Sequence, residues 1–412
     1  MPEFITLLQP DDARLLLLAK IDDRLSNSET VESDFALGRV TAEDVIAPNP
    51  LPAFARSTVD GYAVRARDTY GANDSLPGYL LVKGEVPMGA APDLTVLPGE
   101  CALIHTGGMI PFGADAVIML EYTQSVRTGE IEIQRAVAVG ENVIRIGEDV
   151  SESQVVISKG GRIRPAEIGG LMALGIQKLQ VVQKIRVGLI SSGDEVVSPS
   201  QIPQPGQVRD VNSFSLAALV TQVGGEPVFY GIVPDRFDLL QLTAGKALDD
   251  CDVVIITAGS SASTRDMTAD VIASLGEPGV LVHGINTRPG KPTILGVCKG
   301  KAVIGLPGNP VSALVNGYLF VIPVIEKLLG LYENKPRPSV KARLSVNLAS
   351  QTGREDWQPV KLVQSIDGWQ AEPIFGKSNL IFTLAAADGL IKIHPDANGV
   401  SAGEIVDVFL MV

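Results

Sequence analysis

The residues whose types and spacing most suggest chemistry lie between positions 252 and 310 of this chain. An apolar run at residues 252–257 gives way to small and polar residues at 258–263, and a helical pattern follows from Asp266. A strand that ends in a small-residue loop before a helix presents backbone N–H groups to an anion. The stretch therefore predicts a site for a phosphorylated or oxyanionic ligand.

Hydroxyl groups and cations in the same stretch suit such a ligand. Ser260 and Ser261 can donate hydrogen bonds to phosphate oxygens beside the backbone N–H groups. Arg288, through its planar fork, and Lys291, as a point charge, follow in a loop that proline and glycine stiffen. A solvated surface loop would have the same composition, so both interpretations stay open. The GxxxxGK[ST] and GxGxxG patterns are absent, which excludes the usual P-loop and dinucleotide fingerprints.

Four carboxylates stand at expected turns or strand ends and are candidate metal ligands. They are Asp60, Glu195, Asp235 and Asp266. Mg²⁺ typically takes one or two carboxylates together with the phosphates of a substrate. The alternative is that these residues stabilise turns or helix starts, and Asp266 in particular would cap its helix without any metal.

Composition narrows the class of protein. The 412 residues carry a net charge of -13, which disfavours binding to nucleic acid or to an anionic membrane surface. Three widely separated cysteines predict no disulfide framework and favour the cytoplasm. Glycine and proline interrupt the most apolar stretch, residues 313–325, which is too short to cross a bilayer. A zinc site is not expected, and His105, His283 and His394 are expected to be structural.

From residue 186 onward, strand patterns alternate with helix patterns. This alternation predicts a mostly parallel sheet with right-handed crossovers. Parallel strands end at one edge of a sheet. The residues expected to converge there are Ser192, Asp194, Glu195, Asp235, Ser260 and Asp266. The expected strands are 186–190, 227–233, 252–257, 280–284, 293–297 and 302–305, and the expected helices are 214–223, 237–248, 266–275 and 311–329.

The regions on either side of this alternating pattern predict other kinds of structure. Residues 5–25 predict a helix with an apolar stripe of Leu15, Leu16, Leu18 and Ile21. Short β-rich runs separated by glycine and proline turns predict a small β domain in residues 79–145. A second set, after residue 340, predicts a small barrel or sandwich.

Six separated motifs give the chain a family resemblance. In order they are RSTVDGYA at 56–63, TG at 106–107, GED at 147–149, SGDE at 192–195, RPGKP at 288–292 and GLPGNPVS at 305–312. Together they resemble the molybdopterin molybdenumtransferases, the molybdate-insertion enzymes of molybdenum-cofactor biosynthesis, a family that includes the gephyrin E domain. The resemblance covers essentially the whole chain.

This resemblance implies a multidomain α/β protein. A mostly parallel α/β molybdopterin-binding domain would occupy residues 181–332, and a small inserted β domain residues 47–145. An extended linker domain would combine residues 1–46 and 146–180, and a C-terminal β-barrel would occupy residues 333–412.

The resemblance also implies an activity and an assembly. The enzyme would consume adenylylated molybdopterin and molybdate, use Mg²⁺, release AMP and leave molybdenum on the dithiolene. It would act as a homodimer whose active site is shared between subunits, and the molybdopterin adenylyltransferase would be a possible partner. No nucleic acid and no membrane would be involved.

Family roles fall on matching positions of this sequence. The catalytic set implied is Asp60, Thr106, Glu195, Asp235 and Asp266, with Asp60 and Thr106 supplied by a second subunit and Asp235 and Asp266 as Mg²⁺ ligands. Arg288 and Lys291 would hold molybdate or phosphate, and Pro307 and Pro310 would shape the wall of the site. The remaining substrate-binding residues implied are Ser192, Ser260 and Ser261.

Two departures from the family pattern stand out: the loop at 258–263, and Ala386, where the family often has an arginine. The loop at 258–263 begins with Ala258 where the family usually has glycine, so a Cβ stands where a positive φ or a close approach is expected. A non-catalytic molybdopterin-binding scaffold is therefore a second hypothesis. A tungstate-preferring paralogue is a third.

Overall fold

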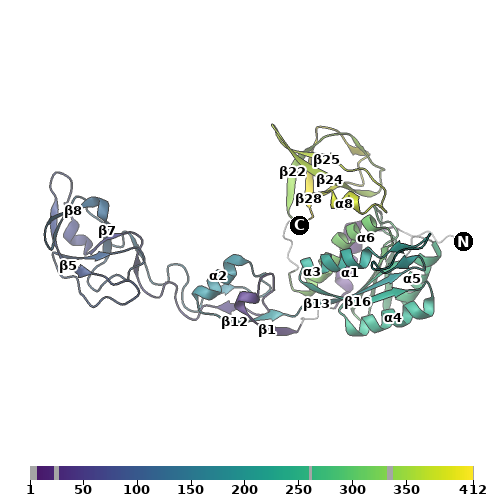
Figure 1. Cartoon of the computed structure of the whole chain (residues 1–412), viewed down its shortest axis with the longest axis horizontal. Helices are drawn as coiled ribbons and strands as arrows, with labels where there is room; N and C mark the ends of the chain where they lie inside the picture. The colour runs from purple at the N-terminus through teal and green to yellow at the C-terminus, as the bar shows by residue number, and fades with distance from the viewer. Residues whose placement is uncertain (1–6, 23–26, 259–261, 332–336, 412) are drawn as a thin grey trace. The chain divides into compact units, whose positions relative to one another are not determined.

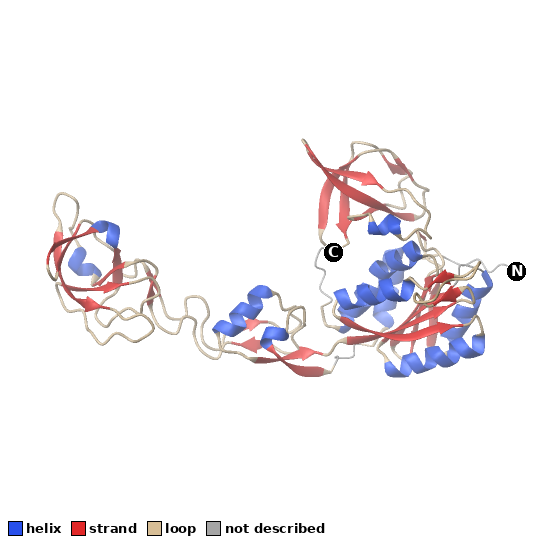
Figure 2. Cartoon of the chain, in the orientation of Figure 1, coloured by secondary structure: helices blue, strands red, loops and turns tan. Residues whose placement is uncertain are grey.

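The computed structural model of the chain describes residues 7–22, 27–258, 262–331 and 337–411. The chain divides into two compact units, which are described separately (Figure 1, Figure 2). The first comprises Met1–Glu29, Gly38–Val40 and Val181–Val412, and the second comprises Thr30–Leu37 and Thr41–Gln180.

A six-stranded mixed sheet with helices on both faces forms the centre of the first unit. Its strand order is β16-β13-β17-β21-β20-β18, in which only β20 runs against its neighbours. This arrangement confirms the predicted mostly parallel sheet. The strands are β13 (Ile185–Ser192), β16 (Gly225–Val233), β17 (Val253–Ala258), β18 (Pro278–His283), β20 (Ile294–Cys298) and β21 (Lys301–Pro307). The helices are α1 (Pro10–Lys20), α3 (Asn212–Gln222), α4 (Phe237–Asp250), α5 (Ala262–Ser274), α6 (Pro310–Asn316) and α7 (Ile322–Leu328).

The central strands are apolar throughout because both faces of the sheet are covered. In β17, Val253 and Ile255 pack against α1, α3, α6 and α7. Val254 and Ile256, which alternate with them, pack against α4 and α5 on the opposite face. The uninterrupted apolar run that the sequence shows is therefore the signature of a strand buried on two sides.

The most apolar segment of the chain is a core helix of this domain. It runs through Pro310–Leu328 as α6, a π-helical turn at Gly317–Val321, and α7. The predicted helix at 311–329 is confirmed to within one residue at each end. By length and composition alone it could cross a membrane, so the expectation that this apolar stretch is too short to do so is wrong. However, 78% of its apolar window is buried inside the protein, with Phe320 fully buried.

A closed five-stranded β-barrel follows the α/β domain in the same unit. The strand order is β24-β25-β22-β28-β26, and a further pairing of β26 with β24 closes the barrel. The short strand β19, from the α/β domain, adds to β24 in parallel. The bounds are β19 (Thr287–Arg288), β22 (Ser339–Leu344), β24 (Glu355–Ser365), β25 (Gly368–Pro373), β26 (Gly389–Ile393), β28 (Ile405–Leu410) and α8 (Phe382–Ala385).

The second unit contains a six-stranded, mostly antiparallel sheet with the order β7-β4-β6-β5-β9-β8. These strands are β4 (Gly61–Val64), β5 (Gly78–Glu85), β6 (Glu100–Ile104), β7 (Ala116–Met119), β8 (Thr123–Arg127) and β9 (Glu130–Ile133). Other strands and one helix lie in this unit or cross its boundary with the first: β1 (Ser28–Glu32), β2 (Val45–Ile46), β3 (Arg56–Ser57), β10 (Val143–Ile144), β11 (Val155–Ile157), α2 (Pro165–Ala173) and β12 (Lys178–Val182). The multidomain α/β architecture with additional β domains confirms the predicted fold class.

The side of helix α1 that is buried differs from the side that the sequence predicted. Leu15 is 54% exposed, whereas Ala13 and Leu17 are fully buried, together with Leu18 and Ile21. The stripe assigned from the sequence was therefore partly wrong. Four consecutive leucines cover too much of the helix circumference to reveal which side faces the core.

Candidate functional site

Five chain segments meet at one edge of the six-stranded sheet in the first unit. Strands β13, β16, β17 and β21 are parallel and end there, at Ser192, Val233, Ala258 and Pro307. The connection from β18 to β20, which carries Arg288 and Lys291, turns at the same edge because β18 runs parallel to β21. Neighbouring strands lie ~4.8 Å apart, so the edge from β16 to β18 is about 24 Å long. The shared edge predicted from the sequence is confirmed, and it is long enough for an extended ligand.

At the β13–β16 end of this edge, three polar residues are joined by hydrogen bonds. The hydroxyl of Ser192 donates to Oδ1 of Asp235 at 2.8 Å, and the backbone N–H of Asp235 donates to Oδ1 of Asp194 at 3.2 Å. Ser192 is buried, whereas Asp235 is half-buried. The structure therefore brings together three of the residues that were predicted to converge, Ser192, Asp194 and Asp235.

Glu195 folds back over the turn that precedes it. A Cβ at Gly193, whose φ is +153°, would lie 2.9 Å from the Glu195 carboxylate and 2.8 Å from the side chain of Val196. Only glycine fits this turn. Glu195 is thus held near Ser192 by the tight turn that begins the SGDE motif.

Asp266 lies in the second turn of α5, because the helix starts at Ala262 rather than at Asp266. The alternative that Asp266 caps its helix is therefore wrong, since small residues of the preceding loop have joined the helix. Its side chain is exposed. Ser260 and Ser261 lie outside the described residues, and Asp235 with Asp266 as joint Mg²⁺ ligands stays a prediction.

Ala258 belongs to β17 and pairs with Pro307 of β21. It is not among the described residues with a positive φ. The expectation of a positive φ at this position is wrong, because the strand continues one residue further than the sequence pattern indicated. A close approach of ligand to the backbone of Ala258 stays a prediction.

A cavity of about 1030 Å³ lies where the edge of the α/β domain meets the C-terminal barrel; we call it the cation pocket. The α/β domain contributes the predicted residues Arg288, Lys291 and Pro307. The charged residues that line it are four cations and one carboxylate: Arg288, Lys291, Arg354, Lys377 and Asp356. These five side chains carry a net charge of +3, in a chain whose net charge is -13. The pocket therefore attracts anions electrostatically. Pro310 is not among the lining residues and instead begins α6.

Two buried asparagines hold the loops of the cation pocket. The Asn316 amide donates to the carbonyl of Pro289 at 3.1 Å, and the Asn212 amide donates to the carbonyl of Gly308 at 2.9 Å. A Cβ at Gly290, whose φ is +107°, would overlap with the Asn316 amide. The glycine of the RPGKP motif is therefore required by both its backbone conformation and its packing.

Asp356 is the one carboxylate among the lining residues, and it contacts two of the cations. Its carboxylate accepts hydrogen bonds from Nε and Nη2 of Arg354, at 2.7 and 3.2 Å, and from the hydroxyl of Ser350, at 2.9 Å. An Nη of Arg288 lies 3.8 Å from the same carboxylate. The pocket therefore combines cations from two domains around one buried anion.

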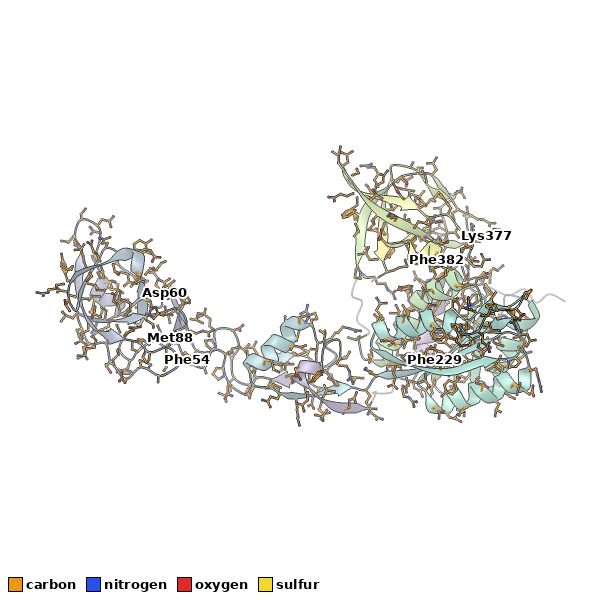
Figure 3. The ribbon with its side chains drawn as sticks, in the orientation of Figure 1. Phe54, Asp60, Met88, Phe229, Lys377 and Phe382 are labelled. Atoms are coloured by element: carbon orange, nitrogen blue, oxygen red, sulfur yellow. The ribbon has the colours of Figure 1, made fainter. Side chains whose placement is uncertain are left out.

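The second unit contains the other predicted polar group. The carboxylate of Asp60 accepts hydrogen bonds from the backbone N–H of Thr106, at 2.7 Å, and from its hydroxyl, at 3.1 Å. These bonds, the backbone one foremost, hold the pKa of Asp60 below its usual value. Figure 3 labels Asp60 on this unit. A Cβ on Gly61 would overlap with the carbonyl of Ile118 on β7, so the Asp-Gly pair lets β4 approach its neighbour closely.

A histidine extends this group. Nε2 of His105 lies 3.1 Å from the Glu85 carboxylate, and Nδ1 lies 3.7 Å from that of Asp60. His105 and His394 are 43% and 66% exposed at the side chain. The expectation of structural histidines is wrong for these two, because each follows the end of a strand, where the side chain reaches solvent.

The polar residues of the cation pocket that were missed from the sequence include Arg354, Asp356, Lys377 and Ser378. They lie in the C-terminal region, more than sixty residues beyond the RPGKP motif. Ser378 accepts a hydrogen bond from the Asn309 amide at 3.1 Å, and its carbonyl accepts one from the N–H of Val311 at 3.0 Å. The only signal available was composition, since Gly353–Asp356 concentrates charge beside a glycine turn.

Comparisons with known proteins agree with this architecture. Three family models match the chain in order: the MoeA N-terminal region (domain I and II) at residues 8–175, a probable molybdopterin-binding domain at 188–327, and the MoeA C-terminal region (domain IV) at 341–411. The fold and its edge site thus define a multidomain molybdopterin-binding α/β protein.

Relatives and solved structures match over nearly full length. A putative molybdopterin biosynthesis protein of Methanocaldococcus jannaschii is 35% identical, with 97% of each chain covered. The molybdopterin molybdenumtransferase of Haemophilus influenzae is 33% identical, with 98% of each covered. A crystal structure of the Pyrococcus horikoshii molybdopterin biosynthesis MoeA protein has a TM-score of 0.86 and 34% identity, and covers 98% of this chain and 100% of its own. The chain belongs to the MoeA family of molybdopterin molybdenumtransferases.

Proposed function

We propose that this chain inserts molybdenum from molybdate into adenylylated molybdopterin and releases AMP. The cation pocket is the observation that carries the proposal. Both substrates are anions, and four cations around one carboxylate offset their repulsion and stabilise charge that moves onto the leaving AMP. Arg288 and Lys291 are exposed and line the pocket, so the guanidinium group of the first and the ammonium group of the second bind the incoming oxyanion.

The length of the sheet edge supports an extended, two-part substrate. Arg288 and Lys291 occupy one end of the edge, whereas Ser192, Asp235 and Glu195 occupy the other. Hydroxyls and carboxylates at this second end suit a phosphate group with its metal ion rather than a bare oxyanion. Pterin phosphate and oxyanion can therefore bind along one edge at the same time.

The residues at the second end fit a magnesium ion that is shared with substrate phosphate. Asp235 and Asp194 offer hard oxygen donors, which Mg²⁺ prefers. Among the described residues, no group of three or more His, Cys, Asp or Glu side chains is placed to hold a metal alone. When bound, Mg²⁺ would neutralise part of the phosphate charge, and Ser192 orients Asp235 towards that position.

The role of Asp60 and Thr106 in this proposal requires a second copy of the chain. Their unit carries an acceptor group, Asp60 with Glu85 and His105, that is chemically unlike the cation pocket. We propose a homodimer in the cytoplasm in which this group completes the site of the other subunit. The molybdopterin adenylyltransferase, which makes the adenylylated substrate, is the expected partner.

The test is AMP release with each substrate omitted in turn. The proposal expects AMP only when adenylylated molybdopterin, molybdate and Mg²⁺ are all present. Tight molybdopterin binding without AMP release would instead select the scaffold function. Faster release with tungstate than with molybdate, at equal concentration, would select the tungstate-preferring alternative.

A further inference from the structure

We propose that Asp356 is a positioning residue that holds Arg288 and Arg354 in the arrangement that binds the oxyanion. This inference rests on the proposed function, because the oxyanion is the proposed substrate. Asp356 does not itself bind the ligand. It acts through the two guanidinium groups that it contacts.

Strand pairing places this carboxylate beside the predicted cation loop. β19 adds to β24 in parallel, with Thr287 opposite Glu355 and Arg288 opposite Asp356. Arg288 leaves the α/β domain at this point, and Asp356 belongs to the barrel. The register therefore fixes which barrel residue stands beside Arg288.

The two arginines use the carboxylate differently. Arg354 is 26% exposed and donates two hydrogen bonds to Asp356, a side-on pair that fixes the plane of its guanidinium group. Arg288 is 66% exposed and lies 3.8 Å away, so most of its fork stays free to donate to a ligand. One carboxylate thus anchors one arginine and orients the other.

Burial makes this arrangement stiff. The Asp356 side chain is only 9% exposed, and the Ser350 hydroxyl occupies another of its acceptor positions. A buried carboxylate with fixed donors cannot rotate freely, since each lost hydrogen bond would leave a charge unsatisfied. Without it, Arg288 and Arg354 would lose their common partner and would repel each other.

A positioning role and a purely electrostatic effect can be separated, because they predict opposite changes in anion affinity when the charge of Asp356 is removed. Asp356 is negative and lines a pocket for anions, so removing its charge should tighten anion binding if only the net charge matters. If Asp356 positions the arginines, removing its charge should weaken binding. The Asp356→Asn variant decides between them.

The experiment is isothermal titration of sodium molybdate into the full-length chain. For Asp356→Asn we expect affinity to fall about tenfold, the loss that follows from one broken charge-assisted interaction. Ser350→Ala, which removes one hydrogen bond to Asp356, should weaken binding in the same direction by about twofold to threefold. This milder variant keeps the test available if Asp356→Asn does not fold.

Glu355→Gln is the matched control. Glu355 is the adjacent residue, is equally buried, and pairs with Lys392, which does not line the cation pocket. Glutamine also keeps an acceptor for the Trp357 indole N–H. We expect this variant to lose thermal stability as Asp356→Asn does but to keep wild-type affinity for molybdate.

Each outcome has one meaning. Weaker binding by both Asp356→Asn and Ser350→Ala, with Glu355→Gln unchanged, supports the proposal. Unchanged or tighter binding by a folded Asp356→Asn overturns it. If the wild-type chain itself binds neither molybdate nor tungstate, the proposed function fails instead.

Discussion

The two polar groups of this protein are built in opposite ways. In the second unit, Asp60 is 57% exposed and is oriented by the backbone and hydroxyl of one neighbouring residue, Thr106. In the cation pocket, Arg288 and Arg354 come from distant parts of the chain and are held by a buried carboxylate. The first is built within one β-sheet, where β4 pairs with β6, whereas the second joins the α/β domain to the barrel.

This difference follows from charge. The Asp60 carboxylate accepts hydrogen bonds from the neutral N–H and O–H groups of Thr106, which the pairing of β4 with β6 places beside it. Several cations gathered around an anion site repel one another until the ligand arrives. They need fixed partners of opposite charge, which a single loop does not provide. The comparison predicts that mutations at the first group are tolerated by the fold, whereas mutations around the second disturb both structure and binding.

The largest effect is expected for Asp60→Asn. If Asp60 takes part in the reaction, AMP release should fall by about a hundredfold or more, while molybdate affinity and thermal stability stay at wild-type values. Steady-state AMP release and calorimetric titration measure the two separately. Asp74→Asn, an exposed aspartate in the same unit, is the control. Wild-type AMP release by Asp60→Asn would remove Asp60 from the proposed mechanism.

The sequence revealed the Asp60 group better than the barrel side of the cation pocket. Asp60-Gly61 and Thr106-Gly107 each carry their own turn signal, and the structure joins them by two hydrogen bonds. Alternating strands and helices also predicted the shared sheet edge, because parallel strands leave few alternatives. His105 was misjudged because its neighbours are apolar, although it lies just beyond the end of β6.

The barrel side of the cation pocket could not be read from the sequence. Arg354, Asp356 and Lys377 carry no motif, and they meet Arg288 only because β19 pairs with β24. That pairing joins two residues of a loop to a strand nearly seventy positions later, and nothing in the local pattern encodes it. Asp266 illustrates the reverse error, since local pattern suggested a helix cap where the helix had already begun.

A pair of glycine variants sharpens the comparison at the level of the backbone. Gly107 and Gly290 have φ of +85° and +107°, but a Cβ at Gly107 meets nothing within 4 Å, whereas one at Gly290 overlaps with Asn316. We expect Gly107→Ala to cost roughly 1–2 kcal/mol from backbone strain alone. Gly290→Ala should cost about 1–3 kcal/mol more from overpacking. Denaturant unfolding compares the free energies of unfolding of the two variants. Equal losses of stability would show that the Asn316 side chain can move aside at little cost.

Lys291→Ala should weaken the pocket without disturbing its fold. Lys291 is exposed and lines the cation pocket, so its removal should raise the KM for molybdate about tenfold and leave the unfolding midpoint unchanged. Lys341→Ala removes a lysine that pairs with Asp407 on the outside of the barrel, and it should change neither. A loss in kcat with an unchanged KM would mean that Lys291 acts after the oxyanion has bound.

The smallest effect on the rate is expected from Thr106→Val, and the direction in which the pH–rate profile moves is informative. Thr106 lowers the pKa of Asp60 through two hydrogen bonds, and valine removes only the hydroxyl one, which is the lesser cause. The pKa of Asp60 should therefore rise part of the way towards its ordinary value. If the ionised carboxylate is required, the acid limb of the pH–rate profile moves to higher pH, while rates near pH 7 stay unchanged. Thr106→Ser, which keeps the hydroxyl, should restore the wild-type limb. An unmoved limb in Thr106→Val would mean that the backbone N–H of Thr106 is sufficient to hold down the pKa of Asp60.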